Sequence, residues 1–374
     1  MKKFCIQIFI FISPLFLILT IISFILAFSG EYFTNIDKLI RNNEKYLIGY
    51  AYNENNYKYL KWFYINSHEK KSIIALGSSR VLQFRASMFD TSFYNAGYTI
   101  SSVNDFLPFL QGIPKSKYPE YLIIGLDQWM FNKNYDNLTI LPTKESWKNS
   151  FVKYPTKNTY WDVFKNIFKG KYNTLFLQKS SIEYIGLNAK INNKGFRNDG
   201  SIYYGDQIIK LINNDTTAND YNYCDTYKRI KNGNSRFEFG NTVNNSALIV
   251  LDKFLKYCSE NQIKVIAFLP PFADKVFNSM IKTENYNYLN EIYPKIKPLF
   301  YKYDYEIYNF SSVSSCNSSD DETLDGYHGG ELTYQKILIK MLDSGSILNN
   351  VSNPERLKSD LIKVKNKYEV YEYE

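Results

Sequence analysis

The stretch Ile73-Ile74-Ala75-Leu76-Gly77-Ser78-Ser79-Arg80 decides the predicted fold. A short apolar run that ends in a turn signal predicts a buried strand, and Gly77 permits the sharp turn after it. A serine at the start of the next helix lies beside free N–H groups and the positive helix end. A nucleophilic serine has this environment, but so does an ordinary serine N-cap. The interpretation therefore depends on partners elsewhere in the chain.

The same alternation of strand and helix recurs along the chain. Apolar runs predict strands at 72–77, 92–97, 121–127, 263–269 and 305–310. Segments with helical spacing lie at 101–112, 246–261, 276–303 and 331–342. Strands that alternate with helices indicate βαβ units, so we expect an α/β protein with a five-stranded, mostly parallel sheet.

The third and fourth strands are separated by residues 130–245, which are rich in Asn, Tyr, Lys and Gly. A segment of this length is not a simple loop, and we interpret it as an insertion that returns to the sheet. A structurally idle excursion is the alternative. The predicted division is an anchor at 1–30, a membrane-proximal lead-in at 31–70, the α/β domain with its insertion at 71–345, and a charged tail at 346–374. From residue 351 on we expect this tail to be an exposed helix or disordered.

The N-terminus carries a continuous apolar run over residues 4–28, which exceeds the ~20 residues needed to cross a bilayer. Lys2 and Lys3 precede this run, so the positive-inside rule places the rest of the chain outside the cytoplasm, in the periplasm or at the cell surface. A signal peptide cleaved near Ala27-Phe28-Ser29 is the alternative. The run is longer than the roughly 7–15 apolar residues of a signal peptide, which favours an uncleaved single-pass anchor.

The net charge and the cysteine content limit the classes of function that this chain can have. The net charge is +8, but the basic residues are scattered among acids. A nucleic-acid footprint requires a basic patch or stripe, whereas this balance fits an anionic membrane surface or envelope polymer. Cys5, Cys224, Cys258 and Cys316 form no C-x-x-C pair, so we predict no metal site and no cofactor. The compartment permits a disulfide among the last three without assigning one.

The chain contains two histidines, His68 and His328. His68 precedes the first strand and therefore belongs to the opposite end from Ser79. His328 follows the last strand, and parallel strands end at a shared edge. Asp325 stands three residues before it, close enough within one turn to accept the ring Nδ1–H and leave Nε2 for the serine. The sequence thus predicts a Ser79-His328-Asp325 triad.

An acyl-transfer site also needs N–H donors where negative charge develops. The candidates at this edge are the Ser79 N–H, the Gly97 N–H after the second strand, and a side chain at the end of the third strand.

These residues resemble the SGNH (GDSL-type) hydrolase superfamily. Its four sequence blocks are matched by Gly77-Ser78-Ser79, Asn95-Ala96-Gly97, Gly125-Leu126-Asp127 and Asp325-Gly326-Tyr327-His328. The resemblance implies a three-layer α/β/α, flavodoxin-like fold with Ser79 as the nucleophile. Asp127 departs from the pattern, because the family has an asparagine there and an ionised carboxylate cannot donate to an oxyanion. Either Asp127 is protonated, Gln128 serves instead, or the oxyanion hole has two donors.

Within the superfamily, the chain is similar to a membrane-anchored branch that includes the D-alanyl transfer protein of teichoic-acid operons and alginate-type polysaccharide O-acetylation proteins. The similarity rests on the G-S-S block before a charged residue, the anchor, the insertion and the late D-x-x-H. It implies a serine acyltransferase or carbohydrate esterase that takes an acyl donor and a cell-surface glycan. A membrane-bound O-acyltransferase is the implied partner. Arg80 and Arg197 are candidate substrate contacts, and Arg197 lies in a stretch, 195–201, that resembles the branch.

A second hypothesis is a catalytically silent scaffold of the same fold that binds glycan or a membrane-bound O-acyltransferase, and Asp127 favours it. A nucleotide-binding protein is disfavoured, because no G-x-G-x-x-G or Walker loop follows the first strand.

Overall fold

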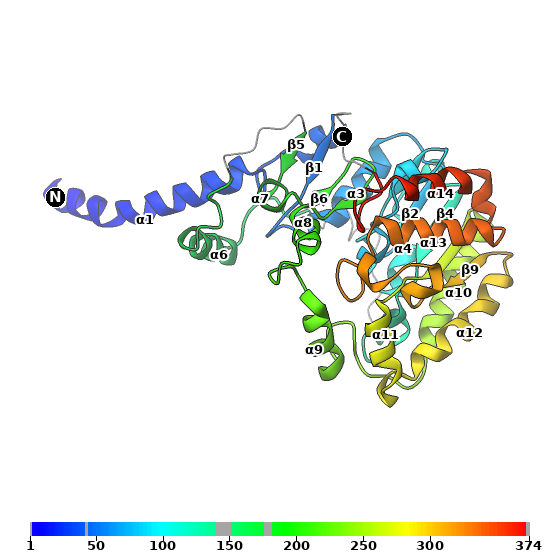
Figure 1. Ribbon diagram of the computed structural model, residues 1–374. Coiled ribbons are helices and arrows are strands. Elements are labelled where there is room, and N and C mark those ends of the chain that lie inside the picture. The colour runs from blue at the N-terminus through cyan, green and yellow to red at the C-terminus, as the bar shows by residue number, and fades with distance from the viewer. Residues whose placement is uncertain (1, 42–43, 139–150, 176–181, 372–374) are drawn as a thin grey trace. The chain divides into compact units, whose positions relative to one another are not determined.

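The computed structural model describes residues 2–41, 44–138, 151–175 and 182–371. The chain forms two compact units (Figure 1). The first contains residues 1–56, 150–198 and 202–206, and the second contains residues 57–149, 199–201 and 207–374. The predicted insertion at 130–245 is therefore divided between the two units, and residues 139–150 and 176–181 of it lie outside the described residues.

The second unit is built on a five-stranded parallel sheet. Its strands are β2 (Ile73–Leu76), β3 (Phe93–Asn95), β4 (Tyr121–Gly125), β8 (Lys264–Leu269) and β9 (Glu306–Asn309). The spatial order is β3-β2-β4-β8-β9, and every neighbouring pair is parallel. Numbered along this sheet, the order is 2-1-3-4-5, the flavodoxin-like doubly wound order. The predicted α/β class and the five predicted strands are confirmed, each strand within two residues of its predicted ends.

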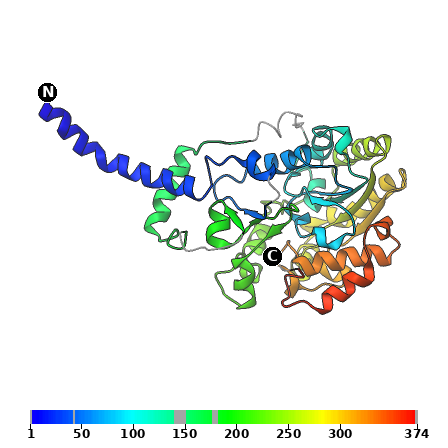
Figure 2. The ribbon, with the colours of Figure 1, turned by 90° about the horizontal axis from the view of Figure 1, so that it is seen from above.

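Helices cover both faces of this sheet (Figure 2). Because successive side chains of a strand point to opposite faces, Ile74 and Leu76 face one apolar cluster while Ile73 and Ala75 face the other. The first cluster includes side chains of α3 (Asn56–Ser67), α4 (Phe106–Gln111), α10 (Asn245–Glu260), α11 (Asp274–Ile281) and α12 (Tyr288–Tyr301). The second includes side chains of α13 (Glu331–Asp343) and α14 (Pro354–Ile362).

Shorter elements connect these layers. The α-helices are α8 (Asp206–Ile212) and α9 (Cys224–Asn232). The 3-10 helices are η1 (Ser79–Val81), η2 (Ala86–Met88), η3 (Val103–Asp105), η4 (Lys115–Lys117), η5 (Gln128–Phe131), η6 (Tyr221–Tyr223), η7 (Glu284–Tyr286), η8 (Val313–Cys316), η9 (Asp320–Glu322) and η10 (Ile347–Asn350).

The C-terminal segment includes a helix, α14, as one of the two predicted alternatives had it, but it is docked on the second unit through buried residues such as Leu348 and Leu357 and is not exposed throughout. Helix α14 starts with a side-chain cap from Asn353 and buries Leu357 completely among the residues of α13. The Glu331 carboxylate accepts N–H donors from Val370 and Tyr371. Residues 372–374 lie outside the described residues. The high charge of this segment misled the prediction, because a few buried side chains, Leu348 and Leu357 among them, and a few backbone bonds suffice to dock it.

The first unit has a small mixed sheet that the sequence analysis did not predict. Its strands are β1 (Tyr46–Ile48), β5 (Glu183–Ile185), β6 (Gly195–Phe196) and β7 (Ile202–Tyr203), in the order β5-β1-β6-β7. Helices α1 (Lys2–Phe28), α2 (Ile36–Arg41), α6 (Lys157–Phe168) and α7 (Leu187–Asn192) complete the unit. Strands of two or three residues leave almost no periodic signal in a sequence, which explains why they escaped prediction.

Helix α1 confirms the predicted N-terminal apolar helix. It has 27 residues and is apolar enough to cross a membrane or to act as a signal sequence. Which of the two it is stays a prediction.

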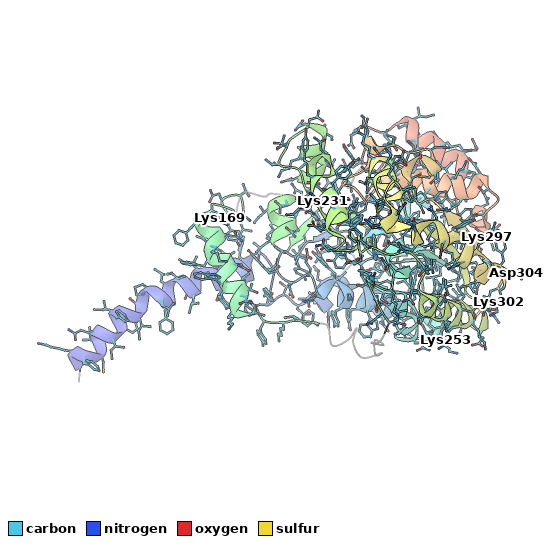
Figure 3. All side chains as sticks on the ribbon, turned by 90° about the horizontal axis from the view of Figure 1, so that it is seen from below. Lys169, Lys231, Lys253, Lys297, Lys302 and Asp304 are labelled. Atoms are coloured by element: carbon cyan, nitrogen blue, oxygen red, sulfur yellow. The ribbon has the colours of Figure 1, made fainter. Side chains whose placement is uncertain are left out.

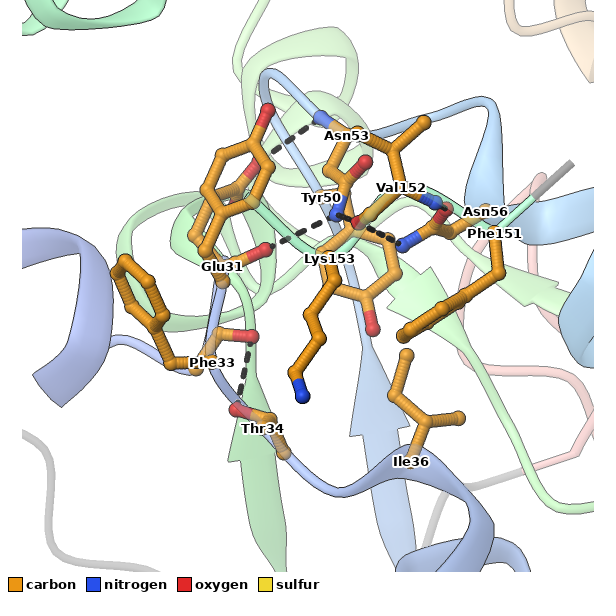
Figure 4. Close-up of a pocket in the computed structure, with 12 residues that line it drawn as sticks. Glu31, Phe33, Thr34, Ile36, Tyr50, Asn53, Asn56, Phe151, Val152 and Lys153 are labelled. Atoms are coloured by element: carbon orange, nitrogen blue, oxygen red, sulfur yellow. Dashed lines mark hydrogen bonds between the residues drawn. The ribbon is translucent and has the colours of Figure 1, made fainter. Parts of the chain in front are cut away.

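A buried carboxylate ties the segment after α1 to the small sheet (Figure 4). Glu31 is 1% exposed, and its Oε1 accepts N–H donors from Ala51, Tyr52 and Asn53, while Oε2 accepts the N–H of Leu187. Burial raises the pKa of Glu31 to about 7, and the four N–H donors offset only part of this rise.

Candidate active site

The turn after β2 separates the roles of two adjacent serines. A Cβ on Gly77 would lie 2.8 Å from a methyl of Val81, so the chain can turn tightly here only with glycine. Ser78 is the N-cap of η1, and its Oγ accepts the N–H of Arg80 at 3.1 Å. Ser79 is the first residue of η1, and its hydroxyl takes no part in the cap. The N-cap interpretation therefore applies to Ser78, which leaves the Ser79 hydroxyl for chemistry.

Ser79, His328 and Asp325 form a continuous hydrogen-bonded chain. The Ser79 Oγ lies 2.8 Å from His328 Nε2, and His328 Nδ1 lies 2.7 Å from Asp325 Oδ2. An ionised Asp325 accepts from Nδ1–H, which leaves Nε2 as the acceptor for the serine O–H. The structure thus brings together the three predicted residues, in the order in which a serine nucleophile needs them.

The surroundings of Asp325 keep it ionised. Its side chain is 18% exposed, and Oδ1 also accepts the backbone N–H of Tyr327 and of His328. Burial alone would raise the pKa of Asp325. The His328 ring and the two N–H donors outweigh burial, so the pKa lies below its ordinary value.

The buried Arg80 side chain connects three of the loops around this site through hydrogen bonds. Its side chain is fully buried and lies over the ring of Phe272, at 4.3 Å. Nε donates to the carbonyl of Tyr327 at 2.9 Å, Nη2 to that of Pro270 at 2.7 Å, and Nη1 to Gln128 Oε1 at 2.8 Å. The prediction that Arg80 contacts substrate is wrong, because its N–H groups already donate to acceptors inside the protein.

Tyr327 fixes the imidazole from the side. Its ring lies against the His328 ring, with centroids 4.4 Å apart, and also contacts Trp129 and Phe237. Since Arg80 follows Ser79 directly and holds the carbonyl of Tyr327, one guanidinium sets the spacing between nucleophile and base. The sequence analysis missed this role because the contact spans 247 residues.

Two of the four predicted oxyanion donors are already committed. The Gly97 N–H donates to Asn95 Oδ1 at 2.9 Å. The Gln128 amide donates to the carbonyl of Pro270 at 2.8 Å and to Ser311 Oγ at 3.3 Å. The Ser79 N–H makes no hydrogen bond to any other residue that the structure describes. It is therefore the predicted donor that stays free for an oxyanion.

Asp127, the fourth candidate, is completely buried. Oδ1 lies 3.5 Å from Arg80 Nη1, too long for a strong hydrogen bond. Oδ2 has no hydrogen-bond partner among the described residues. Burial raises the pKa of Asp127, and the charge of Arg80 offsets only part of this rise. The carboxyl is therefore biased toward its protonated form, the form that can donate.

Arg197 lies in the first unit and is also buried, with 2% of its surface exposed. Nη1 donates to the carbonyl of Ile202 at 3.3 Å, and the guanidinium lies over the ring of Tyr203. Its predicted substrate contact is corrected as well, since the hairpin of β6 and β7 encloses the side chain. His68 lies before β2, as predicted, and stacks on Tyr64.

A second buried network, which the sequence analysis did not predict, holds residues 199–201 against β3. Arg85 pairs with Glu331 at 2.5 Å and with Asp199 at 3.2 Å. The buried Lys61 ammonium donates to the carbonyls of Asn95 and Gly200, and burial lowers its pKa well below the ordinary value. The Asp-Gly-Ser sequence at 199–201 is the feature of the sequence that marks this contact. Its partners, Arg85 and Lys61, lie far away in the chain and gave no local indication of it.

An open groove of about 310 Å³ has Asp325 among its lining residues. Three tyrosines, Tyr223, Tyr227 and Tyr368, line it together with Lys275. Among the described residues, no group of three or more His, Cys, Asp or Glu side chains could hold a metal ion. The four cysteines are free thiols.

No protein-family model and no curated protein sequence matches this chain. The resemblance to the SGNH superfamily therefore remains a prediction from the four sequence blocks.

Proposed function

We propose that this chain is a membrane-anchored, extracytoplasmic serine acyltransferase or esterase that acts on a cell-envelope polysaccharide. The observation that carries the proposal is the hydrogen-bonded chain Ser79-His328-Asp325 at the C-terminal edge of a parallel sheet. The parallel order of the sheet and the long apolar α1 agree with the SGNH resemblance and its membrane-anchored branch.

The geometry supports a two-step transfer. As Ser79 Oγ attacks the acyl carbonyl, His328 Nε2 takes the serine proton, and Asp325 stabilises the imidazolium. The Ser79 N–H donates to the oxyanion. The bond to the leaving group breaks, and the leaving group takes the proton from His328, which gives an ester on Ser79. A sugar hydroxyl or water then attacks this ester by the same steps and releases Ser79.

The groove beside Asp325 suits a glycan acceptor. Tyrosine rings offer an apolar face and a polar hydroxyl to a ligand, and three of them line the groove with Lys275. A membrane-bound O-acyltransferase, the partner that the resemblance implies, would supply the acyl group.

A fluorophosphonate probe tests the nucleophile on the full chain in detergent micelles. We expect covalent labelling of wild type and none of Ser79→Ala. Ser78→Ala is the matched control, since it removes the cap, at about 1 kcal/mol, and keeps the nucleophile. Equal labelling of wild type and Ser79→Ala would contradict the proposal.

The catalytically silent scaffold remains a second candidate, and the committed donors favour it. Gly97 and Gln128 bond within the protein, and Asp127 stands where a donor is needed. Complementation separates the two functions: cells that lack the protein receive wild type or Ser79→Ala, and acylation of the envelope polysaccharide is measured. Full acylation with Ser79→Ala would establish the scaffold.

A further inference from the structure

Helix α6 of the first unit exposes a stripe of aromatic rings in mutual contact. Trp161, Phe164 and Phe168 follow one another on one side of the helix, with ring centroids 5.6 and 4.9 Å apart. Trp161 is 60% exposed and Phe168 is 76% exposed. Contiguous exposed apolar surface of this kind marks an interaction site.

The neighbouring side of α6 packs on the C-terminal third of α1 (Figures 1 and 2). Val163 is fully buried with Ile22 and Leu26, and Tyr160 Oη lies 3.1 Å from Ser23 Oγ. The stripe therefore lies beside the last turns of the apolar helix.

The length of α1 places these turns at a membrane surface. Residues 4–21 precede the buried contacts and span about 27 Å at ~1.5 Å per residue, close to the ~30 Å hydrocarbon core of a bilayer. If α1 spans the membrane, α6 lies where the helix emerges from the lipid.

The charge around the stripe complements lipid phosphates. Lys157, Lys165, Lys169 and Lys171 are exposed on and after α6, and Figure 3 shows Lys169 at its C-terminal end. Asp162 is the sole acidic residue between 151 and 175, and it already pairs with Lys165 at 3.1 Å. Aromatic rings flanked by lysines are typical of the membrane interface.

The same unit exposes further aromatic side chains. Phe24 and Phe28 of α1 stack on each other and are half exposed. Phe33 contacts Tyr154, which is 62% exposed, at 6.0 Å between centroids.

We propose that α6 is an interfacial helix that lies in the headgroup region of the bilayer spanned by α1. Its aromatic stripe enters the boundary between headgroups and acyl chains, and its lysines contact anionic lipid phosphates. This inference rests on the membrane location in the proposed function and is independent of the serine chemistry.

Lipid quenching of tryptophan fluorescence tests the position of Trp161. The full chain is placed in nanodiscs of phosphatidylcholine and phosphatidylglycerol with acyl chains brominated near the headgroup or near the terminal methyl. Trp147, outside the described residues, is replaced by Phe. Trp62 and Trp129 remain, and both pack in the core of the second unit. We expect strong quenching by the shallow bromines, weak quenching by the deep ones, and loss of the quenching in Trp161→Phe.

Equal quenching with and without Trp161 would overturn the proposal. The conservative Phe keeps the helix, so an unfolded variant does not explain a negative result. Flotation of the chain with vesicles is measured in parallel. Loss of flotation would contradict the anchor itself, whereas labelling of Ser79 is unaffected by either outcome.

Discussion

Asp325 and Asp127 are two carboxylates at the same sheet edge, and their surroundings give them opposite properties. Both oxygens of Asp325 accept hydrogen bonds, from the His328 ring and from two backbone N–H groups. For Asp127, Arg80 Nη1 lies 3.5 Å from one oxygen, and the other oxygen has no hydrogen-bond partner among the described residues; the Ser78 side chain and the Arg80 charge offset only part of the effect of burial. The pKa of Asp325 therefore lies below its ordinary value and that of Asp127 above it.

The comparison shows that donors, more than burial, decide the charge of a carboxyl at this edge. Asp325 stays ionised and can orient His328, whereas Asp127 depends on a proton or on Arg80.

Replacing Asp325 by Asn should slow fluorophosphonate labelling of Ser79 by about 10³- to 10⁴-fold. An amide cannot stabilise the imidazolium and can favour the wrong tautomer of His328. The labelling rate constant is the measurement. Asp321→Asn is the matched control, because Asp321 is exposed and its ion pair is with Lys367, away from His328, and it should label like wild type. A rate for Asp325→Asn within twofold of wild type would show that Asp325 does not orient the base.

Replacing Arg80 by Met should lower the free energy of unfolding of the second unit by about 3–5 kcal/mol, because the buried acceptors on Tyr327, Pro270 and Gln128 lose their charged donor. Urea unfolding followed by the fluorescence of the buried Trp129 measures this change. The double variant with Asp127→Asn should recover part of the loss. If the double variant is no more stable than Arg80→Met, the two side chains are not coupled.

Glu31 extends the comparison to a carboxylate with four N–H donors and no cation. Its pKa of about 7 in the folded chain exceeds the ordinary 4.5, so the folded state holds a proton that the unfolded state has lost. Stability of the first unit should therefore be full below pH 4.5 and fall by about 3 kcal/mol as the pH rises to about 7. Urea unfolding across this range is the measurement. Glu31→Gln should flatten the profile, and an equally steep profile in that variant would exclude Glu31 as its source.

Replacing Asp127 by Asn should raise the free energy of unfolding at neutral pH by about 1 kcal/mol, since a buried acceptor without a partner is costly. The raised pKa means that wild type loses stability as the pH rises above 3.8, and the variant should lack this loss. Arg80 keeps three other acceptors. An amide could also donate to the oxyanion and speed labelling of Ser79. Destabilisation by Asp127→Asn would show that the ion pair with Arg80 is net favourable.

The sequence predicted what depends on local pattern. Apolar runs identified the five strands, and the rule that parallel strands end at one edge placed Ser79 and His328 together across 249 residues. The D-x-x-H spacing placed Asp325 on the ring. The apolar run at the N-terminus predicted α1.

Tertiary structure alone decided which polar groups are free. Arg80 and Arg197 looked available for substrate, but long-range packing buries both. Gly97 and Gln128 looked like oxyanion donors, but Asn95 and Pro270 accept their hydrogen bonds. An N–H group that already donates within the protein is not available to a substrate. Its acceptor is fixed by contacts between segments far apart in the chain. The sequence therefore predicted the triad with Ser79 in it, and only the folded chain showed that the Ser78 hydroxyl caps η1 while the Ser79 hydroxyl reaches His328.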